Sequence, residues 1–308
     1  MLYIEAMNFQ QLASLCAIVD HDFNITKAAA ATNSTQPAIS RQIRFLEKNL
    51  GVQIFYRNKK RLTALTRAGE AALAVARRVR TEAENLDKIG KEFSAIDHGD
   101  FIIATTHTYA RYCLPDVIRR FAGIYSNVRV ILKQGDPSEN ANWVASGEAD
   151  LFISTEPAEK FEDIVLLPFA KLERVIVVTK GHPLLNIPRL TFQDIACYPI
   201  ITSRSKTLSS TKSHGIQLNV VITATDSDVI KTYVREGLGI AIMSALAYSS
   251  KEDKDLCCID AGHLFEPHTS LIGLRARSFL RSYMYHFIEM FVPKLKRSVV
   301  EKVLASKH

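Results

Sequence analysis

The sequence predicts a chain with two architectures: an all-α N-terminal domain with a β-hairpin and a long helix, followed by two α/β lobes. Three observations support this fold class. Apolar residues recur at helical spacing up to residue 50, and two short β-prone runs follow. A longer helical period occupies residues 66–93, and beyond residue 98 strand-like and helix-like segments alternate. At 308 residues, the chain can form two or three units that each bury a core.

The first three predicted helices are short and have recognisable ends. A helix over residues 8–20 stops at the polar segment 21–24, and Asn24 can cap a second helix over residues 25–31. Turn residues follow, and Ser34 or Thr35 then caps a third helix. This helix has a proline in its first turn and ends at Gly51. The pattern is typical of a helix-turn-helix.

The third helix has two faces of different chemistry. Its buried stripe is formed by Ile39, Ile43, Leu46 and Leu50. The other face carries side chains that can contact base edges and phosphates: Gln36, Ser40, Arg41 and Arg44. After Gly51, two β-prone runs flank the basic segment 57–61, which predicts a hairpin with a cationic tip, or wing.

Positive charge is concentrated in this part of the chain. Residues 35–80 contain eleven Lys and Arg against two Glu, a net charge of +9, so the rest of the chain carries −2 of the total +7. A patch of this kind gains free energy from counterion release when it meets a polyanion. Nucleic acid is therefore the expected partner, and the alternative is a solvated surface without a partner.

Residues 66–97 are predicted to form one long linker helix. Its apolar seam cannot be buried by the helix alone, so we expect a second copy of the chain to cover it, giving a dimer. The alternative is packing against the second domain of the same chain. The seam consists of Leu73, Ala76, Val79, Ala83, Leu86, Gly90 and Phe93.

The rest of the chain, residues 98–308, is predicted to form two α/β lobes. Lobe I is expected at about 98–169 and 270–308, with strands over 101–104, 128–133, 150–154 and 270–274 and helices near 109–125, 138–147 and 279–305. Lobe II is expected at about 170–269, with strands at 175–179, 220–224 and 240–243 and a helix at 227–237. The chain crosses between lobes near Pro168 and again before residue 270. Such hinged lobes enclose a cleft suited to small ligands.

The segment 104–109 lies where a strand gives way to a helix. At this edge of an α/β sheet, a helix N-terminus offers free N–H groups to an anion, and Thr106 and Thr108 add hydroxyl groups. The alternative is that these threonines only cap the helix.

Other functional classes are excluded by the sequence. It contains no G-x-S-x-G, P-loop or H-E-x-x-H motif, and His107 has no recognisable catalytic partner. Asp226 and Asp228 are expected to cap a helix rather than to act as acid and base. We therefore expect no enzyme, no cofactor and no metal.

The cysteines and the N-terminus point to a cytoplasmic protein. The five cysteines lack metal-binding spacing and are expected to be reduced thiols, and Cys257 and Cys258 are expected in a strand that fills a core. No apolar run is long enough to span a membrane, and the first residues do not resemble a signal peptide.

The N-terminal residues resemble the DNA-binding domain of LysR-type transcriptional regulators, and the resemblance covers essentially the whole chain. It is carried by MNFQQL and by NITKAAAATNSTQPAISRQIRFLEKNLGVQIFYRNKKRLTALTRAGE. The segments ATTHTYARYCLP, TATDSDVIKTYVREGLGI and SFLRSYMYHFI are similar to the CysB and Cbl branch, which regulates sulfur assimilation and sulfonate use. The resemblance implies a winged helix-turn-helix over residues 1–65, an effector domain like periplasmic binding proteins, a homotetramer, and RNA polymerase as a partner. It also suggests translation from Met7.

The resemblance and the residue chemistry together assign a DNA-binding site. The third helix is expected in the major groove, where Gln can pair with adenine, Arg with guanine, and proline can touch a thymine methyl group. Wing residues are expected to bind phosphates or the minor groove. The major-groove set is Thr35, Gln36, Pro37, Ser40, Arg41 and Arg44, and the wing set is Arg57, Lys59, Lys60 and Arg61.

The resemblance also implies an effector pocket lined by Thr106, Thr108, Thr155 and Thr207. Sulfate, acetylserine or adenosine phosphosulfate would suit it. Tyr109 departs from the branch, which commonly has glutamine there, and so puts the effector's identity in question. The leading hypothesis is an effector-controlled regulator of cysteine biosynthesis and of sulfate or sulfonate assimilation. The alternative is a LysR-type regulator of another pathway with a non-sulfur anionic effector. A pure ligand carrier would not need residues 8–65.

Overall fold

The structure is a computed structural model that describes residues 7–59, 61–94, 98–155, 161, 163–203 and 215–306. It contains two compact units. The first comprises residues 1–96 together with the short segment Arg277–Arg281, and the second comprises the remainder of the chain. Each unit is considered separately below.

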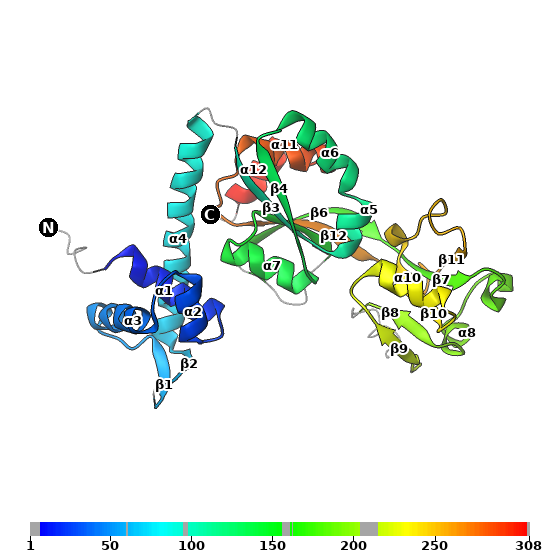
Figure 1. Cartoon of the computed structure of the whole chain (residues 1–308), viewed down its shortest axis with the longest axis horizontal. Helices are drawn as coiled ribbons and strands as arrows, with labels where there is room; N and C mark the ends of the chain where they lie inside the picture. Colours follow the sequence, from blue (N-terminus) through cyan, green and yellow to red (C-terminus); the bar gives the residue numbers. More distant parts are fainter. Residues whose placement is uncertain are drawn as a thin grey trace. The chain divides into compact units, whose positions relative to one another are not determined.

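Unit 1 is a winged helix-turn-helix with a long helix (Figure 1). Side-chain caps set its helix starts as the sequence predicted: Asn24 accepts hydrogen bonds from the N–H groups of Thr26 and Lys27, and Thr35 accepts one from Ala38. Gly51 ends the third helix in the left-handed region, with φ of 68°. The elements are α1 (Phe9–Asp20), α2 (Ile25–Ala31), α3 (Gln36–Leu50), β1 (Phe55–Asn58), β2 (Arg61–Leu65) and α4 (Arg67–Phe93).

The core of unit 1 takes in the first turns of α4. Leu73 and Ala76 are buried with the α1 and α3 stripes, so this part of the expected seam is covered within the chain. Asp20 at the end of α1 pairs with Arg77 at 2.7 Å and with Arg80 at 3.2 Å, which ties α1 to α4. The large apolar side chains that α4 leaves exposed are Val75, Val79, Leu86, Ile89 and Phe93.

The segment Arg277–Arg281 is held on α4 by polar contacts. The Asn85 amide donates a hydrogen bond to the Arg277 carbonyl at 2.7 Å and accepts one from the N–H of Phe279 at 2.7 Å. Arg281, only 3% exposed, donates to Glu92 at 3.3 Å. Residues far apart in sequence thus complete this unit.

Lobe I of unit 2 is built on a mixed sheet in the order β4-β3-β5-β12-β6. An aromatic cluster of Phe101, Phe121 and Phe287 packs α6 and α11 on one face, while α7 packs on the other through Ala141 and Val144 (Figure 1). The elements are β3 (Gly99–Thr105), α5 (His107–Tyr112), α6 (Pro115–Ile124), β4 (Val128–Gln134), α7 (Pro137–Ser146), β5 (Leu151–Thr155), β6 (Ile164–Leu172), β12 (His268–Arg275), α11 (Ser282–Phe291) and α12 (Arg297–Ala305).

Lobe II has a sheet in the order β11-β7-β10-β8-β9 with an apolar core on each face. Ile230 and Val234 of α10 belong to one of these cores. The elements are β7 (Arg174–Thr179), η1 (Pro183–Asn186), α8 (Phe192–Ala196), β8 (Ile200–Thr202), β9 (Val220–Thr223), α10 (Ser227–Arg235), β10 (Ile240–Ser244), η2 (Ala245–Ala247) and β11 (Leu256–Asp260).

The two crossings between the lobes lie side by side. The chain leaves lobe I at Glu173, between β6 and β7, and returns to it at β12, where His268 pairs with Leu172. The crossing expected near Pro168 lies a few residues further along, at Glu173, because β6 continues through Pro168 to Leu172. This strand is at the sheet edge and its pairing shifts register beside Pro168, where a residue without an N–H group is tolerated.

Two long helices of the sequence prediction are each broken in the structure. The helix expected near residues 109–125 is two helices, because Pro115 starts α6 as its first residue. The helix expected over 279–305 is also two, α11 and α12, with Pro293 between them. All five cysteines are free, and the strand at Cys257 and Cys258 is confirmed, although Cys258 is exposed rather than in a core.

Within the described residues, the structure contains no helix with both the length and the apolar character needed to cross a membrane.

Two glycines of α4 should respond in opposite ways to alanine. A Cβ atom at Gly69 would lie 2.1 Å from the backbone oxygen of Ile54, whereas one at Gly90 would meet nothing within 4 Å. We expect Gly69→Ala to lower the free energy of unfolding by about 1–3 kcal/mol through overpacking. Gly90→Ala should raise it by up to about 1 kcal/mol, because alanine favours helix. Urea denaturation of the full chain, followed by circular dichroism, measures both. If both substitutions changed the free energy of unfolding equally, the close contact of Gly69 with Ile54 would be contradicted.

Candidate DNA-binding surface and effector site

Helix α3 presents the predicted major-groove set on an accessible face. Thr35, Gln36, Pro37, Arg41 and Arg44 are exposed, and Ser40 is partly exposed. Gln36 hydrogen-bonds to Thr26 of α2, which orients its amide. The buried stripe of Ile39, Ile43 and Leu46 lies opposite, as the sequence predicted. Leu50 was expected in this stripe, but it is 44% exposed at the C-terminal end of the helix. The face combines amide, hydroxyl and guanidinium donors, the groups that read base edges.

Two residues that the sequence analysis did not assign lie on the same face. Phe45 is 50% exposed, and Lys48 is exposed one turn from Arg44. They line a hollow of about 570 Å³ together with Thr35, Pro37, Ala38, Arg41 and Arg44. Their spacing of four and seven residues from Arg41 was the signal that could have identified them.

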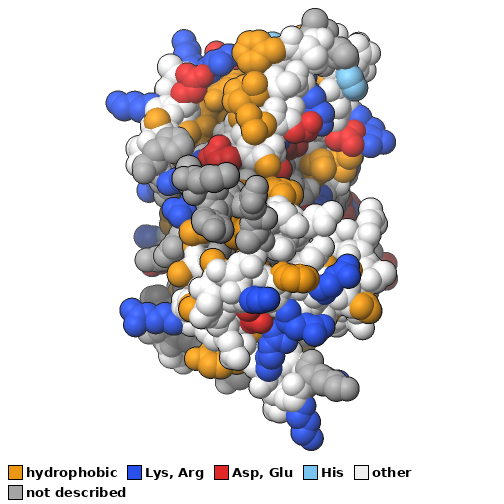
Figure 2. Space-filling model, turned by 90° about the vertical axis from the view of Figure 1, so that its left-hand side faces the viewer, with side chains coloured by type: hydrophobic (Ala, Val, Ile, Leu, Met, Phe, Trp, Pro, Cys, Tyr) orange, Lys and Arg blue, Asp and Glu red, His pale blue; other side chains and the backbone are white. Residues whose placement is uncertain are grey.

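The hairpin of β1 and β2 forms the predicted wing. Its residues Lys59 and Arg61 are exposed, and Lys60 lies outside the described residues. Arg57 also belongs to the wing, but its guanidinium contacts Glu47 of α3 at 2.6 Å, so its charge is already paired. Glu47 further accepts the N–H of Ile54, which fixes the base of the wing. In Figure 2, Lys and Arg side chains project around the lower part of the molecule and at its lower tip.

The described effector-site residues gather at one edge of the lobe I sheet. Thr106 and Thr108 follow the end of β3, and Thr155 ends the neighbouring parallel strand β5. Thr106 occupies the cap position of α5 without a side-chain hydrogen bond to the helix, so the capping alternative does not hold for its hydroxyl. Thr108 lies 3.1 Å, oxygen to oxygen, from the hydroxyl of Ser227 in lobe II. Thr207 lies outside the described residues.

Tyr109 points into lobe I and is 2% exposed. Its hydroxyl donates to the Ser270 hydroxyl at 2.6 Å, and Ser270 pairs with Thr155 across β12 and β5. Its ring meets Phe169 edge to face. Burial raises the pKa of Tyr109 far above its usual range, so this residue stays neutral. The hydroxyl is therefore engaged within the lobe.

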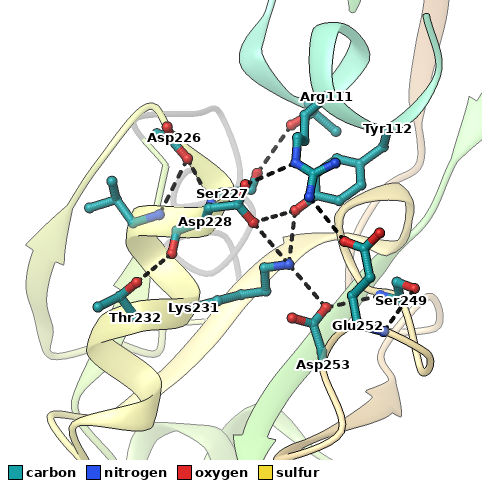
Figure 3. A network of polar contacts seen from close by, with 12 residues as sticks. Arg111, Tyr112, Asp226, Ser227, Asp228, Lys231, Thr232, Ser249, Glu252 and Asp253 are labelled. Carbon is teal, nitrogen blue, oxygen red and sulfur yellow. Dashed lines mark hydrogen bonds and ion pairs between the residues drawn. The ribbon is translucent and has the colours of Figure 1, made fainter. Parts of the chain in front are cut away.

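The N-terminus of α10 faces α5 across the lobe boundary (Figure 3). Asp226 caps α10, as expected, by accepting the N–H groups of Asp228 and Val229. His107 does have a partner that the sequence did not reveal, since its Nε2 lies 3.1 Å from Asp226. Asp228 reaches further, to the Tyr112 hydroxyl at 2.5 Å and the Lys231 ammonium at 3.0 Å.

His107, Asp226 and Asp228 place potential metal ligands within 4.8 Å of one another. The Lys231 ammonium at 3.0 Å and the Arg111 guanidinium at 3.6 Å from Asp228 already neutralise this carboxylate. A divalent cation would be repelled by both, so we assign the group to interlobe contacts rather than to a metal.

Comparison with known protein families matches both parts of the chain. Residues 9–70 match the bacterial regulatory helix-turn-helix protein model of the lysR family, and residues 95–296 match the LysR substrate binding domain.

Relatives match along nearly the full length. The transcriptional regulator SsuR of Burkholderia cenocepacia is 43% identical, covering 97% of this chain and 99% of the relative. The regulator CysB of Haemophilus influenzae is 42% identical, covering 96% and 93%. Among solved structures, the cofactor-binding domain of the Cbl transcriptional regulator superposes with a TM-score of 0.63 at 35% identity, covering 67% of this chain and 93% of that domain.

Proposed function

The chain belongs to the LysR family of bacterial transcriptional regulators, and on that premise we propose that it controls genes of sulfur assimilation in response to a small effector. Like its relatives, it is a regulator and not an enzyme. Its similarity to SsuR and CysB over almost the whole length supports the pathway, because the CysB and Cbl branch regulates sulfur use. Such a regulator meets its operator in the cytoplasm.

The exposed face of α3 is the observation that carries the DNA-binding proposal. Arg41 is exposed, and its guanidinium makes no hydrogen bond or ion pair among the described residues, so it can pair with a guanine. Lys59 and Arg61 of the wing supply phosphate contacts that do not depend on sequence. Base reading and charge neutralisation therefore fall to different elements.

Two arginine variants should separate these roles. Arg41→Ala should weaken binding to a duplex selected by the wild-type protein by about 1–3 kcal/mol, with little loss on random duplex. Arg61→Ala should weaken both and reduce the salt slope by about one charge. Fluorescence anisotropy over a range of salt concentrations measures this. Equal loss on both duplexes for Arg41→Ala would exclude it from base reading.

We further propose that helix α4 pairs with α4 of a second copy. Its exposed apolar residues recur at spacings of three, four and seven, namely Val75, Val79, Leu86, Ile89 and Phe93. This is the heptad spacing of a two-helix seam. Within unit 1, Leu86 is 71% and Phe93 81% exposed, so unit 1 itself does not cover them and a partner chain could. Dimers of such dimers would give the tetramer.

A charge placed in this seam should dissociate the assembly. Leu86→Glu would bury a carboxylate between two helices, so sedimentation should show smaller species at micromolar concentration. Lys91→Gln makes the same change in charge on the opposite face of α4 and should leave the assembly intact. An unchanged assembly in Leu86→Glu would exclude the seam.

We propose that the effector binds at the lobe I edge where Thr106, Thr108 and Thr155 gather. Hydroxyl groups can donate to an oxyanion without adding charge, which suits sulfate, acetylserine or adenosine phosphosulfate. A second candidate function has its own observation: the hydroxyl of Tyr109 is engaged by Ser270, so the branch's glutamine amide has no equivalent here. That change favours a non-sulfur anionic effector and a different pathway.

Thermal shift of the full chain with sulfate, thiosulfate, acetylserine and adenosine phosphosulfate distinguishes these functions. An effector at a hundredfold its dissociation constant should stabilise the protein by about 2.7 kcal/mol. Thr108→Ala should weaken the response, and Thr63→Ala, which removes a hydroxyl in the wing, should not. If none of the four stabilises the protein, the sulfur proposal is wrong. If Thr108→Ala responds like the wild type, the site is misplaced.

A further inference from the structure

A tyrosine of lobe I packs into lobe II. Tyr112, the last residue of α5, contacts the lobe II core that contains Ile230 and Val234 of α10. Its hydroxyl end faces the Lys231 ammonium, whose nitrogen lies 5.1 Å from the ring centre. Separating the lobes would therefore expose apolar surface on both.

The Tyr112 hydroxyl completes the coordination of a buried cation (Figure 3). The side chain of Lys231 is 2% exposed, and its ammonium donates to Tyr112 at 2.8 Å, Asp253 at 3.0 Å and Asp228 at 3.0 Å. An ammonium has three protons, so all three are satisfied, one of them only by lobe I. Burial alone would lower the pKa of Lys231, but these three hydrogen bonds raise it to about 12.

Further contacts between the lobes surround this group. Arg111 of α5 pairs with Glu252 at 3.1 Å, and His107 lies beside Asp226. Both contacts are partly exposed to solvent, which weakens the attraction between their groups. The contact between Tyr112 and the buried Lys231 is therefore the centre of the network.

We propose that Tyr112 is an interlobe positioning residue, which through Lys231 and Asp228 holds α5 against α10 before any effector binds. The proposal rests on the proposed effector site, because the same contact sets Thr108 opposite Ser227 at 3.1 Å. The two covalent crossings lie together at Leu172 and His268 and form a single narrow connection. Without the Tyr112 contact, this connection and the more exposed contacts of His107, Thr108 and Arg111 would remain to hold the lobes.

The expected function of the contact is preorganisation. If the lobes sampled many separations, only the fraction of molecules with α5 and α10 in place would bind effector. The apparent affinity would then be the intrinsic affinity multiplied by that fraction. A buried lysine that one lobe cannot fully satisfy favours the assembled state, because an unpaired donor in that environment is costly. The effector therefore acts on lobes whose spacing is already set.

Hydrogen exchange of the full chain without effector or DNA tests the contact. Tyr112→Phe keeps the ring but removes the hydroxyl, and should speed exchange of the α5 and α10 amides by roughly fivefold, as expected for one lost hydrogen bond. Tyr248→Phe is the matched control, because Tyr248 packs on the same core and, among the described residues, its hydroxyl donates to the Leu256 carbonyl within lobe II. Arg111→Gln should have a smaller effect than Tyr112→Phe.

Distances between spin labels in the two lobes give an independent measurement. Labels at the exposed residues Arg119 in α6 and Gln193 in α8 are attached through unnatural side chains, because the chain has five free thiols. Tyr112→Phe should broaden the distance distribution, while the wild type and Tyr248→Phe remain narrow. The proposal is overturned if Tyr112→Phe changes neither measurement, or if Tyr248→Phe changes them equally. Both measurements omit effector, so failure of the sulfur proposal would not affect them.

Discussion

Helix α4 packs against two different parts of the structure along its 27 residues. The positions of the DNA-binding core and of the segment Arg277–Arg281 both depend on it. Its first turns belong to the DNA-binding core, where Gly69 lets the helix approach the backbone of Ile54 and Leu73 is buried. Further along, Asn85 holds the segment Arg277–Arg281 by two hydrogen bonds. Along another face, from Val75 to Phe93, the helix exposes an apolar seam. Because one part of the helix packs in the DNA-binding core and another exposes the seam, α4 would connect that core to a partner chain bound at the seam.

Local signals were sufficient to predict most elements. Asn24, Thr35 and Gly51 mark helix ends through their own side chains or backbone freedom, so no tertiary information was needed. The prediction of element boundaries failed at prolines, because a proline can either end an element or be tolerated within one. Pro115 and Pro293 interrupt apolar periods that continue on both sides, and Pro168 sits inside an edge strand, where only its sheet position makes it acceptable.

The candidate sites were predictable to different degrees. The reading face of α3 is contained in one helix, so the period of 3.6 residues gives it directly. The effector site cannot be predicted from one element, because its residue Thr108 contacts Ser227, which is 119 residues away in the sequence. Lys231 shows most clearly what the sequence alone does not predict. In the sequence it is an ordinary helix lysine, and its burial requires acceptors from Tyr112 and Asp253, which come from two other segments.

The chemistry of Tyr109 constrains what the lobe I edge can bind. A glutamine would offer both a donor and an acceptor, whereas Tyr109 gives its only proton to Ser270 and turns an aromatic ring toward Phe169. Because burial keeps the pKa of the phenol high, no negative charge develops there to repel an anion. The described threonines nearby are also neutral. An anionic effector would thus be held by hydroxyl groups and backbone dipoles rather than by a formal cation among these residues, which favours ligands with several oxygen acceptors over those with charge alone.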